Sequence, residues 1–384
     1  MRHFGSLGKR GITRMALGTV VIVVVVVAAV GAYFYYSSLA GPPTTMTSVT
    51  PTTSVASVTE KPTLRIAILL PGQKNDLSWN QAAYESYLKM IADLNSQGKY
   101  NLATSAAEGL YTAADITPAL TSLGSQGYDL VIGDGFQFTG PAIQLSPTYP
   151  NTGFLISGGY ESAKNVAILL PATGEAGFIL GVLAARLSHS GKVGVIGGED
   201  VSEITWATKG FLLGVSYANQ NFGLNVQAMS TFLGNFNDPA GAKSAAAADV
   251  AQGVDVLYCT GDGISVGVAS EAESAKVAFI YNDFNETSLA PDVTVGGLSY
   301  SIAPIYEQAL NDWLTNHTFS ALPYYATFPN QGLSLELTSK VSANDAAVVQ
   351  TLLQAIIANK IRVYQEVTNG TLVYSPVTPA FNTL

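Results

Sequence analysis

The sequence predicts an α/β protein with two parallel sheets, each covered by helices on both faces, behind an apolar segment near the N-terminus. Short apolar runs alternate with stretches of helical spacing along most of the chain. The runs are almost continuously apolar, which is typical of parallel strands covered by helices on both faces. A chain of 384 residues with 48% apolar content is long enough for two such domains.

The individual elements follow from this alternation. Strands are predicted over 64–70, 129–133, 153–157, 166–170, 192–196, 254–259 and 277–281. Helices are predicted over 79–95, 174–187 and 244–252, and a last helix over 344–360 leads into a short strand over 361–365. Asp238 precedes the Ala-rich stretch 239–249 and is a natural N-cap for a helix there.

The N-terminal part predicts a membrane anchor followed by a stalk. Residues 15–36 are mostly apolar, and a helix with a rise of about 1.5 Å per residue spans a hydrocarbon core of about 30 Å over this length. Residues 1–14 are basic, so the positive-inside rule predicts a single-pass cell-membrane protein with its C-terminal domain extracytoplasmic. The alternative is a cleaved signal peptide, for which Ser38-Leu39-Ala40 is an acceptable cleavage site. Residues 37–62 are rich in Ser, Thr and Pro, which is typical of an extended stalk.

Charge and cysteine content exclude several classes of partner. The net charge is −9, and without the four basic residues before the apolar segment it becomes −13, from 14 basic and 27 acidic residues. A domain with this charge repels nucleic acid. Cys259 is the only cysteine, so neither an intrachain disulfide nor a multi-cysteine metal site is expected. We expect no metal and no cofactor, because the three histidines have no spaced metal-ligating partners.

The loops after the strands carry the candidate site, because ligands of open parallel sheets bind outside the carboxyl ends of the strands. In the stretch 66–80, an apolar strand and a Pro-Gly break are followed by polar residues and an aromatic at the start of a helix. We expect ligand contacts here from Asn75, Asp76, Trp79 and Asn80. The alternative is a purely structural role, as a helix cap for Asp76 and as a core side chain for Trp79.

Later loops repeat this combination of aromatic, glycine and carboxylate. Phe136 follows Gly-Asp-Gly after one strand and is able to stack on a ligand. Trp206 follows another glycine-rich loop, and Asp262 and Asp283 follow two further strands. The alternatives are a core position for Trp206 and a cap for Asp262. We expect the carboxylates to accept hydrogen bonds from ligand hydroxyls while the aromatics cover a flat ring.

These motifs also resemble a known family. Pro71-Gly72, Asn75-Asp76, Ser78-Trp79-Asn80-Gln81 and Tyr84-Glu85 are similar to the opening signature of the basic membrane protein family of substrate-binding lipoproteins, whose members include purine nucleoside receptors of ABC transporters. The resemblance continues in order through 128–133, 149–150, 175–185, 192–198, 209–214, 237–239, 252–256 and 289–291. It therefore covers roughly residues 64–314.

The resemblance implies a type I periplasmic-binding-protein fold, in which two Rossmann-like lobes joined by three hinge crossings close on a ligand. It implies an N-terminal lobe of 63–166 and 284–318 and a C-terminal lobe of 167–283 and 319–384. Family aromatics sandwich a nucleobase and family acidic residues hold the ribose. Asp76, Trp79 and Asn80 match the first ligand loop, and Asp283 matches a later acidic position. The implied partners are a small-molecule ligand, a nucleoside or related ring compound, and an ABC transporter permease, and no enzymatic activity is implied.

Two departures from the family pattern leave the identity of the ligand open. Nucleoside-binding members carry an aspartate where this chain has Gly158, and a lysine where it has Ser299 or a neighbour. The lipid-modified cysteine of the family is also absent, so residues 15–36 would take over its anchoring role.

Two other functions fit parts of the sequence. Ser265 lies in a Gly-x-Ser-x-Gly pattern between a strand and a helix, which with Asp283 and His317 has the chain order of an α/β-hydrolase triad. A membrane-anchored ligand sensor would use the same two lobes, with its output passing through partners because the cytoplasmic part is short.

Overall fold

The structure is a computed structural model that describes residues 60–363 and the backbone of 366–368 and 371–373. The predicted tail, anchor and almost all of the predicted stalk lie outside the described residues. Within the residues described, no helix is long and apolar enough to cross a membrane. The anchor over 15–36 therefore stays a prediction.

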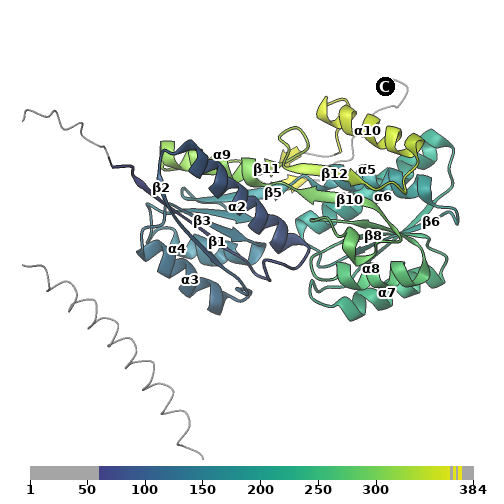
Figure 1. Ribbon diagram of the computed structural model, residues 1–384, viewed down its shortest axis with the longest axis horizontal. Coiled ribbons are helices and arrows are strands. Elements are labelled where there is room, and N and C mark those ends of the chain that lie inside the picture. Colours follow the sequence, from purple (N-terminus) through teal and green to yellow (C-terminus); the bar gives the residue numbers. More distant parts are fainter. Residues whose placement is uncertain (1–59, 364–365, 369–370, 374–384) are drawn as a thin grey trace, which may run out of the picture. The chain divides into compact units, whose positions relative to one another are not determined.

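The first lobe is built on a six-stranded parallel sheet in the order β11-β5-β4-β3-β1-β2 (Figure 1). Its strands are β1 (Thr63–Leu69), β2 (Asn101–Ala107), β3 (Leu130–Asp134), β4 (Gly153–Ser157), β5 (Val166–Pro171) and β11 (Tyr324–Ala326). Helices α3 (Ala113–Ser125) and α4 (Thr139–Leu145) cover one face, and α2 (Trp79–Gln97) and α9 (Ala303–Asn316) cover the other.

The second lobe repeats the arrangement in the order β12-β10-β9-β8-β6-β7, with β12 antiparallel to its neighbour. Its strands are β6 (Lys192–Gly197), β7 (Gln227–Phe232), β8 (Val256–Thr260), β9 (Ala278–Tyr281), β10 (Thr294–Tyr300) and β12 (Leu333–Leu337). Helices α7 (Pro239–Ala251) and α8 (Ser265–Ala275) cover one face. The other face carries α5 (Thr173–Leu187), α6 (Ser202–Phe222) and α10 (Ala343–Ile357).

The first seven predicted strands and the predicted helices are confirmed, with ends that differ by a few residues; the last helix, for example, ends at Ile357. Asp238 caps α7 as predicted, since its Oδ1 accepts a hydrogen bond from the Gly241 N–H at 2.8 Å. The strand expected over 361–365 lies partly outside the described residues. The next strand along the chain, β13 (Glu366–Thr368), pairs antiparallel with β14 (Thr371–Val373).

The chain crosses between the two sheets three times within residues 60–363, after β5, after β10 and after β11. The second and third crossings differ from the expected lobe boundaries. β10 was expected in the first lobe but pairs with β9, and β11 was expected in the second but pairs with β5. A Cβ on Gly297 would lie 2.3 Å from the Tyr281 carbonyl oxygen, so glycine at this position lets β10 lie against β9. The glycines of β10 also interrupt the apolar pattern by which a strand is predicted.

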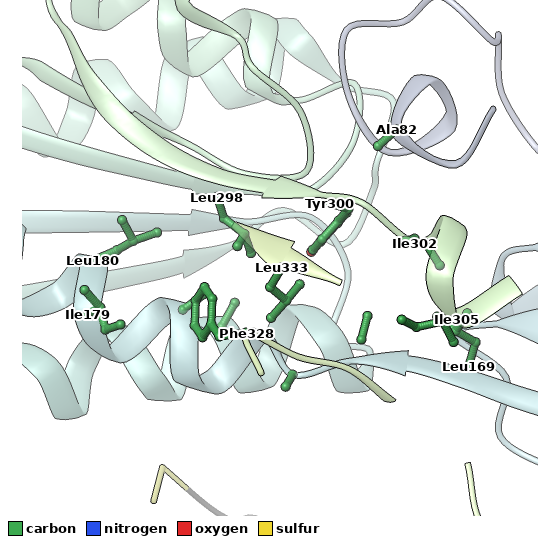
Figure 2. Packing of buried hydrophobic residues seen from close by; sticks show 14 of the residues in the cluster. Ala82, Leu169, Ile179, Leu180, Leu298, Tyr300, Ile302, Ile305, Phe328 and Leu333 are labelled. Carbon is green, nitrogen blue, oxygen red and sulfur yellow. The ribbon is translucent and has the colours of Figure 1, made fainter. Parts of the chain in front are cut away.

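Hydrophobic side chains at all three crossings pack together (Figure 2), and Leu169 of β5 lies at the first. Leu298 and Tyr300 come from the end of β10, Ile302 and Ile305 from the start of α9, and Leu333 from the third crossing. All are buried in a cluster that runs through both lobes. The crossings are therefore packed segments and not loose linkers.

Helices α5 and α6 touch through their backbones. A Cβ on Gly181 would lie 2.1 Å from the Phe211 carbonyl oxygen, and one on Gly214 would lie 2.1 Å from the Phe178 carbonyl oxygen. Only glycine allows this approach. Because α5 is buried on nearly every face, α6 is fixed firmly against the second lobe.

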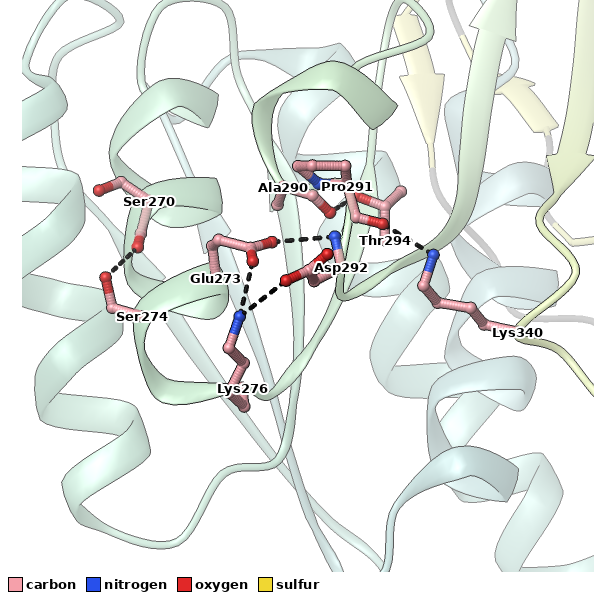
Figure 3. A network of polar contacts seen from close by, with 9 residues as sticks. All are labelled: Ser270, Glu273, Ser274, Lys276, Ala290, Pro291, Asp292, Thr294 and Lys340. Carbon is pink, nitrogen blue, oxygen red and sulfur yellow. Dashed lines mark hydrogen bonds and ion pairs between the residues drawn. The ribbon is translucent and has the colours of Figure 1, made fainter.

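The outer face of the second lobe carries an exposed polar network (Figure 3). Lys276 Nζ lies 2.8 Å from Glu273 Oε1 and 3.1 Å from Asp292 Oδ2, and Lys340 donates to the Pro291 carbonyl oxygen at 2.8 Å. The network ties the end of α8 to the loop before β10. It lies away from the carboxyl ends of the strands that form the site described next.

Candidate ligand-binding site

A cavity lies between the lobes at the carboxyl ends of both sheets. It encloses about 690 Å³ of space, a figure that includes the open solvent at its mouth. The first lobe lines it with Pro71, Gly72, Trp79, Tyr111, Gly135, Phe136, Gln137 and Gly158. The second lobe lines it with Val201, Glu203, Ile204, Phe236, Asn237, Asp262, Asp283 and Tyr300. Nearly all of these residues lie in loops or helix starts that directly follow a strand, and Tyr300 ends β10.

Aromatic side chains from both lobes form much of the lining. Trp79 packs edge-on against Tyr300, with 5.5 Å between ring centroids, so a contact between the lobes fixes its orientation. Phe136 and Phe236 are half-buried, and Tyr111 is 43% exposed. Apolar faces with a few polar groups suit a flat ring compound, because stacking on aromatics needs only a flat π-surface.

Asp76 and Asn80 hold the first loop in place and do not line the cavity. Asp76 Oδ1 accepts hydrogen bonds from the backbone N–H of Ser78 and of Gln81, at 2.9 and 3.1 Å, and so satisfies donors at the start of α2. Asn80 Nδ2 donates to Asp76 at 2.6 Å and to Asp262 at 3.1 Å, and its Oδ1 accepts from the Gly72 N–H at 2.8 Å. Asn80 is therefore fully hydrogen-bonded, and it links the two lobes.

Asp283 forms a second polar link between the lobes. Its Oδ2 accepts a hydrogen bond from Ser78 Oγ at 3.4 Å, and its Oδ1 accepts one from Asn282. The residue is 3% exposed and has a φ of 77°, a left-handed conformation that is uncommon outside glycine. Strained backbone of this kind concentrates at functional sites.

The carboxyl groups of the site are crowded and mostly buried. Burial raises the pKa of Asp283 to about 7. Burial, with the negative charges of Asp76 and Asp283, raises the pKa of Asp262 well above its usual range. Burial alone raises the pKa of Glu203. Asp134, fully buried at the end of β3, has its pKa raised in the same way.

Cationic side chains are missing from the lining, since no Lys, Arg or His is among the described residues that face the cavity. The described residues also contain no group of three or more His, Cys, Asp or Glu placed to hold a metal ion. Among the described residues the lining is therefore rich in carboxyl groups and lacks cationic side chains.

Four of the eight predicted site residues line the cavity: Trp79, Phe136, Asp262 and Asp283. Asp76 and Asn80 support the first loop, Asn75 is exposed, and Trp206 is 8% exposed on the packed face of α6. Trp206 is not among the residues that line the cavity. Whether these residues bind a ligand stays a prediction.

Sequence reasoning missed Tyr111, Glu203, Phe236 and Tyr300 as cavity-lining residues. Tyr111 follows β2 and Phe236 follows β7. These two edge strands contain many polar residues, so neither strand was predicted and no ligand-binding loop was expected after it. Glu203 stands just before Trp206, and its position in the first turn of a helix after a strand was an available signal.

The hydrolase triad is not assembled. Ser265 is buried at the start of α8, against the second sheet, whereas His317 is exposed at the end of α9, against α2 and β11 of the first lobe. A nucleophile and its base must lie within hydrogen-bonding reach of one another.

A two-lobed α/β fold with a cavity between the carboxyl ends of its sheets is typical of the class of bilobal binding proteins. The family model described as ABC transporter substrate-binding protein, PnrA-like, matches residues 63–321, so the chain belongs to the Bmp family.

Individual relatives agree with this assignment. The ABC transporter nucleoside-binding protein BmpA of Lactococcus lactis is 32% identical over 205 residues, which are 52% of this chain and 55% of that protein. The transcriptional activator protein Med of Bacillus subtilis is 27% identical over 246 residues, 63% of this chain and 73% of that protein. A solved ABC transporter solute-binding protein from Conexibacter woesei shares the fold, with a TM-score of 0.63 at 22% identity, covering 78% of this chain and 98% of that one.

Proposed function

We propose that the chain is an extracytoplasmic solute-binding protein that captures a nucleoside between its two lobes and delivers it to an ABC transporter permease. The observation that carries the proposal is the interlobe cavity, which combines aromatic faces with buried carboxyl groups. Membership of the Bmp family and the nucleoside-binding relative from Lactococcus lactis support it. Residues 15–36 would anchor the protein in the membrane.

A nucleoside matches the two kinds of lining. Its base offers a flat π-face to Trp79, Phe136 or Phe236, and its ribose hydroxyls donate hydrogen bonds to carboxylates such as Asp262 and Asp283. Because no described cationic residue lines the cavity, the site favours uncharged or cationic ligands over phosphorylated ones.

The mechanism is closure of the lobes around the ligand. Each lobe supplies about half of the lining, so a ligand makes its full set of contacts only when both lobes engage it. The Asn80–Asp262 and Ser78–Asp283 hydrogen bonds join the lobes directly beside the cavity and would stabilise the closed arrangement.

Calorimetry on Trp79→Ala tests the proposal. In the solubilised full chain we expect nucleoside affinity to fall about 30-fold or more, since a buried aromatic anchor typically contributes at least about 2 kcal/mol to binding. Tyr160→Ala is the matched control, because Tyr160 is 68% exposed and does not line the cavity. Unchanged affinity in Trp79→Ala, or an equal loss in both variants, would contradict the role of this cavity.

A membrane-bound sensor is the second candidate, favoured by the relative from Bacillus subtilis that is a transcriptional activator protein. Transport and sensing share the binding step, so ligand affinity does not separate them. Uptake of radiolabelled nucleoside by cells with and without the gene does: loss of uptake supports transport, whereas unchanged uptake with altered transcription supports sensing.

A further inference from the structure

Glu203 is a cavity-lining carboxylate to which the rest of the fold offers little hydrogen bonding. It lies in the first turn of α6, is 8% exposed and faces the cavity. Among the described residues, the hydrogen bond to its carboxylate comes from its own backbone N–H. A buried carboxylate with so few donors is costly, and a ligand that supplies further donors would lower that cost.

The first lobe leaves room for this carboxylate. Gly158 follows β4 with a φ of +68°, and a Cβ built on it would lie 2.5 Å from Glu203 Oε1 and 3.6 Å from the Phe136 backbone nitrogen. Glu203 therefore reaches across from the second lobe into space that a side chain at position 158 would fill. Its carboxylate lies next to the loop that carries Phe136.

The other acidic groups lie elsewhere in the cavity. Asp262 is hydrogen-bonded to Asn80 at 3.1 Å, and Asp283 to Ser78 at 3.4 Å, so both lie beside the first loop. The cavity thus has two acceptor regions, one at Glu203 and one at Asp262 with Asp283. A nucleoside also has two donor regions, on the base edge and on the ribose.

We propose that Glu203 determines specificity by accepting two parallel hydrogen bonds from a base edge with adjacent N–H donors, as guanine presents, while Asp262 and Asp283 face the ribose. A carboxylate matches such a donor pair with its two oxygens. Adenine presents a donor beside an acceptor and does not match a carboxylate. The inference rests on the proposed nucleoside function and names the edge of the ligand that the site recognises.

The test compares guanosine and adenosine binding to the full chain by calorimetry, in wild type and Glu203→Gln. Glutamine keeps the size of the side chain but offers one donor and one acceptor, which matches adenine. We expect guanosine affinity to fall about 10-fold or more and the guanosine-to-adenosine ratio to fall further, since a hydrogen bond to a charged group contributes about 1.5–3 kcal/mol. Glu161→Gln, at an exposed glutamate outside the cavity, is the matched control.

Three results would overturn the inference. Unchanged guanosine affinity in Glu203→Gln would show that the carboxylate does not contact the base. Equal weakening of both nucleosides would place Glu203 on the ribose, and tighter adenosine than guanosine binding in wild type would exclude the predicted edge. In all three cases nucleoside binding itself, and so the proposed function, would stand. If no nucleoside bound wild type, both proposals would fail.

Discussion

The two lobes share one strand order but line the cavity with different chemistry. All three cavity carboxylates, Glu203, Asp262 and Asp283, come from the second lobe. The first lobe contributes glycines, Gln137 and aromatic residues, and its own acidic residue in the first loop, Asp76, is used to hold the start of α2. The same loop positions on equivalent sheets therefore serve different purposes.

This difference suggests a division of labour on binding. An aromatic wall accepts a flat ring in almost any orientation, because stacking depends little on which atoms the ring carries. Carboxylates require donors at defined places and so discriminate between ligands. The aromatic residues, most of which belong to the first lobe, would hold the ring. On closure, the carboxylates of the second lobe would select ligands by their hydrogen-bond donors.

The largest expected effect concerns how the second lobe fixes Glu203. Gly181→Val forces a branched side chain against the backbone of α6, which carries Glu203, and should lower the free energy of unfolding by about 3 kcal/mol or more. Gly140→Ala in the first lobe is the control, since its Cβ would meet nothing closer than 3.7 Å. Urea unfolding measures the free energy of unfolding of both variants. Equally small losses would mean that α5 and α6 can move apart at little cost in stability.

A smaller loss is expected where the lobes meet. Asn80→Ala removes the donor of Asp262 and the acceptor of the Gly72 N–H, and leaving these buried groups unpaired should cost about 2 kcal/mol. Asn75→Ala in the same loop is the control, because Asn75 is exposed. If the two variants had the same melting temperature, the claim that Asn80 stabilises the protein by joining the lobes would be contradicted.

The acidity of the second lobe predicts a pH dependence. Burial raises the pKa of Asp283 to about 7, above the value of an unfolded aspartate, so the folded state holds more protons between about pH 4 and pH 7. Its stabilising contribution is complete below that window and is lost as pH rises through about 7. The melting temperature of the ligand-free protein should therefore be higher at pH 5 than at pH 8.

Asp283→Asn tests this assignment directly. The variant should flatten the pH dependence and raise stability at pH 8 by about 1 kcal/mol, because it removes a buried charge. Glu161→Gln, at an exposed position, should leave the profile of the wild type unchanged. An unaltered profile in Asp283→Asn would mean that other buried groups, such as Glu175, whose pKa burial also raises to about 7, control it.

The smallest effect is expected on the outer face of the second lobe. Lys276→Gln breaks the contacts to Glu273 and Asp292 shown in Figure 3, but exposed ion pairs contribute little. We expect neither the melting temperature nor the ligand affinity to change measurably. A clear loss of affinity would show that the charged groups on this outer face influence ligand binding in the cavity.

The sequence by itself determined the class of fold and the edge of the sheets at which the cavity lies. Central strands such as β1, β3 and β8 are continuously apolar because both faces are covered, so they can be read without tertiary information. Trp79, Phe136, Asp262 and Asp283 were found because they follow such strands. Strands β2, β7 and β10 were missed, because edge position and glycine content remove the apolar signal.

Only the tertiary structure decided which side chains face the cavity. Whether Asp76 caps a helix depends on backbone donors a few residues away, and its hydrogen bonds from the N–H groups of Ser78 and Gln81 show that it does. Its contact with a ligand stays a prediction. Glu203 gains its position from the second lobe and from the missing side chain of Gly158 in the first. Such a contact joins residues far apart in the chain, and no local pattern records it.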